Sequence, residues 1–244
     1  MNTGKQPVIS SQKNLPAPVV IVKKEDPVVV KRSEAPVLAE AEPLARKFLE
    51  AKTVAELLPL IRHPKITELR MRAVYRDGKI APVGMSKFNS SGDMSVRGKL
   101  ASLLVRTGEQ MEKPLAFIET PQGLKVDWES WVGWSEISWE KFLSTKPTSA
   151  QVFRVSLSEV NYYNFDFSDE SKWQSYRLIS PDGEHSLYGY VEKGSALDRK
   201  IAPTEDMKVA NLMLSLKFPA GAASNGQVEI EGFVTEGWVE DDTP

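Results

Sequence analysis

The chain contains no cysteine, and this absence removes several classes of site at once. Disulfides, zinc–thiolate centres and thiol nucleophiles all need a cysteine sulfur, so they are excluded. Only two histidines are present, His63 and His185. Neither has a serine or aspartate at the spacing of a catalytic triad, and neither has a partner at the spacing of metal ligands. There is no glycine-rich phosphate loop either. We therefore expect no metal and no cofactor.

A strong positive charge and long apolar runs are also missing. The formal net charge is −2 at pH 7, whereas a protein that binds nucleic acid through bulk charge needs a basic face. We therefore expect no nucleic-acid partner. No run reaches the length of a transmembrane helix, and residues 19–22 are too few for a signal-peptide core. The expectation is a soluble protein, in the cytoplasm or, if an anchor preceded Met1, in a bacterial periplasm.

Residues 1–43 form an N-terminal arm that holds six of the sixteen prolines and no aromatic residue. Such a segment cannot bury enough apolar surface to offset its ordering entropy, so we predict that it is disordered. The phrase Pro-Val-Val recurs at residues 18–20 and 27–29, each time followed by β-branched residues and lysine. A stiff, proline-rich spacer is one interpretation. A strand that adds to the sheet edge of a partner is the other. Residues 240–244 are predicted to form an acidic C-terminal tail.

Helical spacing begins near Pro43, which suits the first turn of a helix. The stretch Thr53-Val54-Ala55-Glu56 predicts a capping box for a second helix, which should end at His63 because a proline follows. A third helix is predicted over residues 66–75. Its buried side should carry the apolar residues Ile66, Leu69, Ala73 and Val74.

A period of two then indicates strands, with one short helix near residues 138–143. The strands are predicted over residues 100–106, 115–120, 124–128, 153–158, 173–179, 186–192, 212–218 and 228–234. Pro181-Asp182-Gly183-Glu184 is a strong hairpin signal between two of them. In the last strand, Val228, Ile230 and Val234 should share one face.

Helices followed by a mainly antiparallel sheet predict one α+β domain over residues 44–239, with the N-terminal helices packed on one face of a curved sheet. This order resembles the nuclear transport factor 2-like (NTF2-like) cone fold. The stretches that carry the resemblance are residues 45–51 (ARKFLEA), 56–61 (ELLPLI) and 123–128 (GLKVDW). The chain is also similar to an uncharacterised bacterial family of such domains with proline-rich tails. The superfamily spans enzymes and binding subunits, so the resemblance implies a fold but no particular activity.

The resemblance also implies a possible homodimer through the open face of the sheet. Two apolar residues, Met213 and Phe233, interrupt otherwise polar strand faces and are candidates for that contact. Isolated apolar residues on a surface are common, however, and need no partner.

Four of the six tryptophans fall within residues 128–139. Trp128, Trp131 and Trp134 are therefore candidates for a ligand-binding or partner-binding surface, with core packing as the alternative. Residues 124–128 read as a strand, and neighbours in a strand point to opposite sides. On this reading Trp128 points inward, while Asp127 and Glu129 lie on the solvated face.

Two more aromatic stretches lie at residues 161–167 and 187–190. Tyr162 and Tyr163 are candidate binding residues, and alternating tyrosines in a strand are typical of cross-strand pairing. If the chain is an enzyme, Asp127 or Glu129 would act with Tyr188 or Tyr190. A carboxylate beside an indole in a dry pocket can have a raised pKa and serve as a general base.

The leading interpretation is a non-catalytic domain that binds a partner protein or a small ligand and is tethered by its N-terminal arm. The first alternative is a pocket enzyme of the hydratase or isomerase type. The second is a glycan-binding domain that uses the tryptophan-rich strip. The sequence names no ligand for any of the three.

Overall fold

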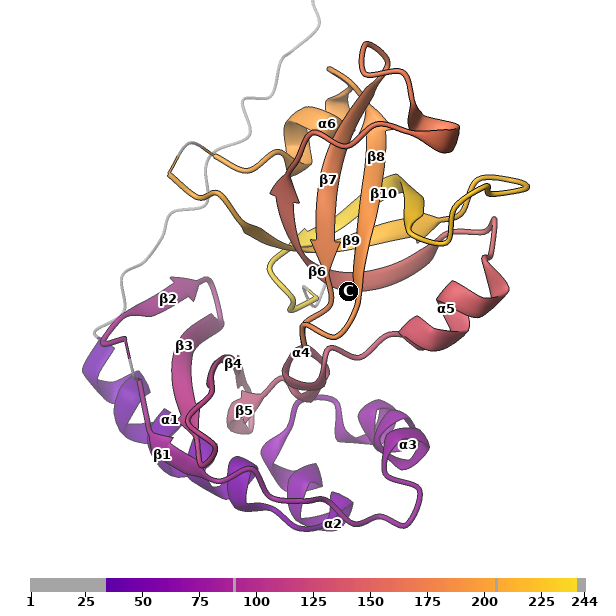
Figure 1. Cartoon of the computed structure of the whole chain (residues 1–244). Helices are drawn as coiled ribbons and strands as arrows, with labels where there is room; N and C mark the ends of the chain where they lie inside the picture. The colour runs from indigo at the N-terminus through magenta and orange to yellow at the C-terminus, as the bar shows by residue number, and fades with distance from the viewer. Residues whose placement is uncertain (1–33, 90, 205, 241–244) are drawn as a thin grey trace, which may run out of the picture. The chain divides into compact units, whose positions relative to one another are not determined.

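The computed structural model describes residues 34–89, 91–204 and 206–240. All of its elements belong to one compact unit, Lys31–Pro244. The repeated Pro-Val-Val phrases and residues 241–244 lie outside the described residues. The α+β class is as predicted, but the strands form two separate sheets, one open and one closed (Figure 1).

The first helix starts ahead of Pro43. Helix α1 spans Glu34–Glu50 and holds Pro43 in its interior. Ala41 is fully buried, and Leu38 packs against the same apolar cluster, so the apolar face of the helix already exists before the proline. The missing N–H and the ring of a proline normally disfavour a helix interior. Burial of the preceding turn outweighs that cost here, and the predicted boundary at Pro43 is therefore wrong.

The second helix begins at the predicted capping box. Helix α2 (Val54–Leu57) has Thr53 as its N-cap, and the Thr53 hydroxyl accepts the Glu56 N–H at 3.2 Å. The Glu56 carboxylate reaches back and accepts the Lys52 N–H at 2.7 Å. A short 3₁₀ helix, η1 (Leu58–Leu60), follows with a proline in its first turn.

The third helix lies within two residues of its predicted bounds, but the opposite face is buried. Helix α3 (Pro64–Val74) buries Thr67 and Met71. Ile66 and Leu69 of the predicted stripe are 58% and 74% exposed. The prediction for this face is wrong, because helical spacing reveals an apolar stripe but cannot say whether another element covers it.

The open sheet packs against α1 through strands β1 and β5. Its order is β1-β3-β4-β5, with β2 pairing β3 on the same side as β1. The strands are β1 (Met85–Lys87), β2 (Met94–Arg97), β3 (Leu100–Thr107), β4 (Glu112–Thr120) and β5 (Gly123–Val126). The inward residues of this sheet and the buried face of α1 form the first apolar core.

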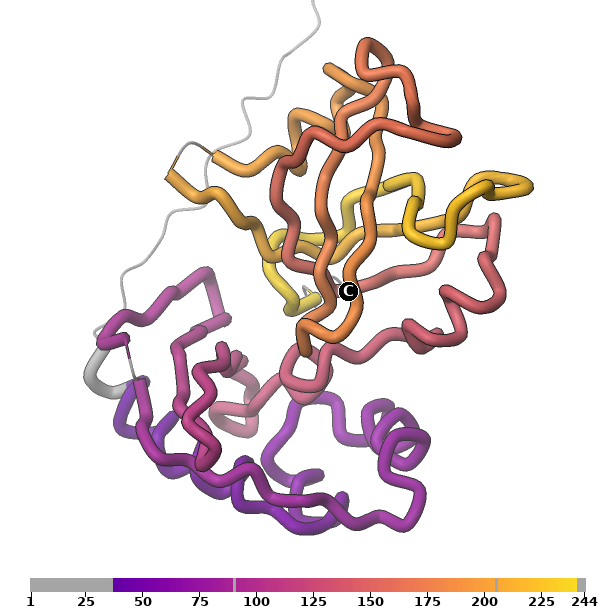
Figure 2. The backbone as a smooth tube through the Cα atoms, viewed as in Figure 1, coloured from indigo at the N-terminus to yellow at the C-terminus, as the bar shows by residue number. Residues whose placement is uncertain are grey.

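The chain then passes through two short helices into the closed sheet (Figure 2). The helices are α4 (Trp128–Val132) and α5 (Trp139–Thr145). The strands are β6 (Gln151–Glu159), β7 (Trp173–Ile179), β8 (Ser186–Glu192), β9 (Ala210–Lys217) and β10 (Gln227–Glu236), with helix α6 (Ala196–Ile201) between β8 and β9. A second apolar core fills this barrel.

The barrel closes in the order β6-β7-β8-β10-β9 and back to β6, and β8 and β10 run parallel. A five-stranded Greek-key barrel with a parallel third–fifth pair and a helix before the fourth strand has the topology of an OB-fold. Gly189 on β8 leaves room for two inward side chains of the barrel. A Cβ at Gly189 would lie 2.7 Å from Leu178 and 2.9 Å from Ile230.

The last strand departs from the predicted alternation. The pairing of β10 with β9 shifts register between Ile230 and Gly232 and again between Phe233 and Thr235. Such bulges turn the following residues to the other face, so Val234 is exposed although it was expected inward.

Of the two residues suggested for a dimer contact, neither lies on an open polar face. Met213 is buried. Phe233 packs against the second core, and the Lys200 ammonium lies 4.8 Å from its ring centroid. The homodimer therefore stays a prediction, and these two side chains no longer support it.

Candidate functional site: an aromatic surface on the barrel

The tryptophan-rich strip lies where the open sheet ends, and it forms packing contacts. Trp128 is 1% exposed. Trp131 meets Phe48 edge to face at 6.0 Å between ring centroids. The Arg70 guanidinium carbon lies over the Trp134 ring, 4.1 Å from the ring centroid. The strip therefore does not form a row of exposed indole faces.

Asp127 and Glu129 are buried, in contrast to the predicted solvated face. The reason is local: strand β5 ends at Val126, and Asp127 becomes the N-cap of α4 by accepting the Ser130 N–H at 2.6 Å. Strand alternation no longer applies beyond that point. Asp127 also forms an ion pair with Arg62. Both carboxylate oxygens of this candidate base are therefore engaged in structural contacts.

Glu129 is held in the same way by two arginines. It pairs with Arg70 on α3, and its other oxygen lies 3.7 Å from the Arg154 guanidinium on β6. Arg154 is 3% exposed, and it donates to the Trp238 carbonyl at 2.7 Å and to the Trp134 carbonyl. Burial lowers the pKa of Arg154, and the charges of Asp127 and Glu129 oppose that shift. These contacts connect helices α3 and α4, the barrel and the C-terminal segment.

The two tyrosine-containing stretches of the sequence come together on the outside of the barrel. The loop between β6 and β7 folds over strand β8, and the Tyr162 ring stacks on Tyr188 at 4.0 Å between centroids. In the same manner Phe167, in the 3₁₀ turn η2 (Phe165–Phe167), stacks on Tyr190 at 4.1 Å with an interplanar angle of 2°. Both tyrosines of β8 are therefore covered by aromatic side chains from one loop.

A hydrogen-bond network beneath the loop fixes its position. The Tyr190 hydroxyl donates to the Tyr162 carbonyl at 2.8 Å and accepts from the Gln227 amide at 2.7 Å. The Gln227 amide also donates to the Asn164 side chain at 2.7 Å. Burial raises the pKa of Tyr190, while hydrogen bonds from Gln227 and Ser175 oppose the rise. This hydroxyl is therefore a neutral structural group at physiological pH.

The most exposed ring in this loop belongs to Phe165. Its side chain is 60% exposed, and its backbone has φ +49°. A bulky residue in the left-handed region is strained by about 1–3 kcal/mol, and such residues cluster at functional sites. Tyr162 is 37% exposed. We define Tyr162, Phe165 and Tyr188 as the aromatic surface.

The surroundings of the aromatic surface are polar and only weakly charged. Arg177 on β7 pairs in register with Tyr188 and donates to the Ser186 hydroxyl at 3.1 Å. On the other side, the Ala223 N–H of the β9–β10 loop donates to Asp166 at 3.0 Å. The two loops that flank strands β7 and β8 are thus joined, and both border the aromatic surface.

The structure separates the remaining candidate residues into two groups. Asp127 and Glu129 belong to the arginine cluster at α4, whereas Tyr188 and Tyr190 belong to the barrel. Among the described residues, no recorded hydrogen bond joins the two groups. Tyr163 is half-buried in the β6–β7 loop. The geometry therefore does not assemble the carboxylate–tyrosine pair that the enzyme hypothesis needs.

The residues that the structure describes contain no cluster of three or more histidine, aspartate or glutamate side chains arranged to hold a metal ion. None of the described helices is long and apolar enough to cross a membrane. His185 stacks on Trp139 at 5.8 Å between ring centroids, and its Nε2 lies 3.4 Å from a Glu140 carboxylate oxygen.

Comparison with family models, with curated proteins and with solved structures gave no match. The function therefore has to be argued from the residues of this chain.

Proposed function

We propose that the chain is a non-catalytic binding domain that holds its ligand against the aromatic surface of the barrel. The observation that carries this proposal is the exposed, strained Phe165 beside the half-exposed Tyr162–Tyr188 stack. Rigid aromatic rings bring a large contact area at a low cost in conformational entropy. Strain at an exposed phenylalanine is difficult to explain by packing, since the ring contributes little to the core.

The position of the aromatic surface supports the same proposal by analogy of fold. OB-fold barrels bind oligonucleotides and oligosaccharides on the face of their second and third strands, between the loops that join strands one and two and strands four and five. Here those elements are β7, β8, the β6–β7 loop and the β9–β10 loop. The analogy is one of topology alone, and a fold by itself transfers no ligand.

Neutral oligosaccharides fit the surface better than nucleic acids. The chain has a net charge of −2, and Arg177 is the basic residue that pairs in register with Tyr188 beside the stacked rings. Nucleic-acid binding needs several phosphate contacts from basic side chains. Sugar rings can stack on tyrosine and phenylalanine without that charge, while the exposed Asn161 of the same loop offers an amide group for their hydroxyls. In this proposal the tyrosines take the role first considered for the tryptophans.

The other predictions remain proposals of lower support. A hydratase or isomerase would need a free carboxylate near Tyr188 or Tyr190, whereas Asp127 and Glu129 are paired with arginines. The likeness to the NTF2-like fold is supported by the helices and the curled sheet of residues 34–126, but a five-stranded barrel has no place in a single cone. The tethering role of the N-terminal arm rests on its composition.

The proposal is tested by titrating neutral hexasaccharides into the full chain and its variants. Cello-, chito- and maltohexaose are suitable probes. Loss of an aromatic anchor from a binding surface costs about 2 kcal/mol, or roughly thirtyfold in Kd. We expect losses of this order for Tyr162→Ala and Phe165→Ala, whose folding should be intact because both rings are exposed. Met111→Ala is the matched control, because Met111 is an exposed apolar residue in the turn between β3 and β4. Equal affinity for all four proteins would refute the site.

A further inference from the structure

Helix α3 presents an apolar row to the outside of the protein. At 3.6 residues per turn, Ile66, Leu69 and Ala73 fall on one side of the helix. The side chains of Ile66 and Leu69 are 58% and 74% exposed, and Ala73 is exposed as well. Thr67 and Met71, on the opposite side, are buried. Core packing therefore accounts for the inner side of the helix but not for the outer row.

Basic side chains lie beside this outer row. Lys65 and Arg72 are seven residues apart, so they share a side of the helix next to Leu69. Arg76 follows in the turn after the helix, and all three basic side chains are exposed. Residues 64–79 contain five basic side chains and two acidic ones. No ion pair joins Lys65 or Arg76 to a described residue. The outer side of α3 is therefore both apolar and basic, although the whole chain has a net charge of −2.

The contacts of α3 limit the kind of partner that its outer side can take. A helix bound in the groove of a protein uses positions i, i+3, i+4 and i+7, and the i+4 position after Ile66 is Arg70. Arg70 is engaged by Glu129 and by the Trp134 ring, so one flank of the helix is already attached to the segment around α4. A second copy of the chain is disfavoured, because two basic surfaces would then face each other. A flat anionic surface needs only the outer row and the charges beside it.

We propose that the outer side of α3 binds the surface of an anionic lipid bilayer. Ile66 and Leu69 enter the boundary between the head groups and the acyl chains, while Lys65 and Arg76 contact the lipid phosphates. Helices with an apolar row and basic residues bind bilayers in this way, and each basic residue near the surface adds to the affinity. This surface shares no residue with the aromatic surface of the barrel, so either proposal can fail without the other.

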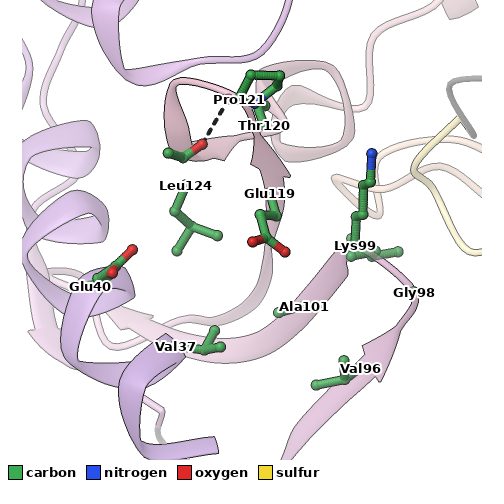
Figure 3. A pocket seen from close by; sticks show the side chains of 12 residues that line it. Val37, Glu40, Val96, Gly98, Lys99, Ala101, Glu119, Thr120, Pro121 and Leu124 are labelled. Carbon is green, nitrogen blue, oxygen red and sulfur yellow. Dashed lines mark hydrogen bonds between the residues drawn. The ribbon is translucent and has the colours of Figure 1, made fainter. Parts of the chain in front are cut away.

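A cavity at the open sheet shows why the lipid contact is assigned to α3. The apolar residues Val37 and Leu124 line this cavity, which has a volume of about 610 Å³ and lies between α1 and the β4–β5 turn (Figure 3). Their side chains lie inside a hollow, so a flat bilayer does not reach them. Ile66 and Leu69 instead project from the convex side of a helix, where a flat surface can meet both at once.

The experiment is co-sedimentation of the full chain with vesicles of phosphatidylcholine alone and of phosphatidylcholine with about one third phosphatidylglycerol. Each basic residue near an anionic surface strengthens binding about fivefold, so we expect at least about tenfold tighter binding to the anionic vesicles. Raising the ionic strength from about 0.1 M to about 1 M shortens the screening length and should remove most of this preference. Equal affinity for both vesicles would overturn the proposal. Absence of binding to the anionic vesicles would also overturn it, and would direct the outer row to a partner protein instead.

Substitutions on α3 separate a defined surface from general adsorption. Leu69→Ser should weaken binding to the anionic vesicles about tenfold, and Lys65→Gln and Arg76→Gln about fivefold each. All three side chains are exposed, so the melting temperatures should be unchanged. The matched controls are Met111→Ser, in the exposed turn between β3 and β4, and Lys208→Gln, at an exposed position before β9. If the α3 variants bind as the two controls do, the assignment of the surface is wrong.

Discussion

Arg154 is the residue whose loss should most clearly report on the contacts that join helix α4 and the segment after it to the barrel. It is 3% exposed on strand β6. Its guanidinium donates hydrogen bonds to the Trp134 and Trp238 carbonyls and lies 3.7 Å from the Glu129 carboxylate. Arg154→Met keeps most of the apolar length of the side chain and removes the charge and the donors. We expect the protein to fold and to be markedly less stable.

The magnitude follows from the groups left behind. Each buried carbonyl without a donor costs about 1–3 kcal/mol, and breaking a buried ion pair costs about 3–5 kcal/mol when the other charge has no substitute. Glu129 keeps Arg70, so the ion-pair cost is only partly realised. Burial disfavours the charged guanidinium, as the lowered pKa of Arg154 indicates. Replacing Arg154 by methionine removes this desolvation cost, which offsets part of the loss in stability. The balance is a loss of about 3 kcal/mol in the free energy of unfolding.

Urea denaturation followed by tryptophan fluorescence measures this loss. Arg72→Met is the matched control, because Arg72 is exposed and only makes an i,i+4 pair with Glu68, worth about 0.3–0.5 kcal/mol. A loss below 1 kcal/mol for Arg154→Met, or one equal to that of Arg72→Met, would refute the reasoning. It would mean that water reaches both carbonyls and that the arginine cluster is not a structural link.

Three further substitutions or deletions test other parts of the structure. Trp128→Ala should cost about 3–5 kcal/mol in denaturant melts, as buried aromatic residues do, and a loss under 1 kcal/mol would place the indole outside the core. Deleting residues 1–33 should leave the melting temperature nearly unchanged. Deleting residues 1–43 should lower it by more than about 5 °C, because the first part of α1 is then removed. Equal melting temperatures for the two deletions would contradict the assignment of α1.

Features set by local chemistry could be predicted from the sequence. Strands β7 and β8 have the predicted bounds, because Pro181-Asp182-Gly183-Glu184 specifies a turn through its own backbone preferences. The Thr53 capping box is a contact within four residues and was likewise readable. The clustering of aromatic residues near Tyr162 and Tyr188 was visible as composition in two separate stretches.

Features set by distant contacts could not be predicted. The parallel pairing of β8 with β10 closes the barrel, and no local pattern indicates which strands pair. The stacking of Tyr162 on Tyr188 depends on that closure, since it requires the β6–β7 loop to fold over a particular strand. The error at Asp127 was avoidable in part, because aspartate is a favoured N-cap. A cap at that position ends the strand at Val126, two residues earlier than predicted.

The central claim is that a ligand binds the aromatic surface of the barrel, and backbone NMR tests it most directly. Amide shifts of the full chain are followed while cello-, chito- or maltohexaose is added to saturation. The account predicts shifts concentrated at Tyr162, Phe165 and Tyr188 and in the β9–β10 loop, and their loss in Tyr162→Ala. Shifts confined to the open sheet, or none with any of the three sugars, would contradict it.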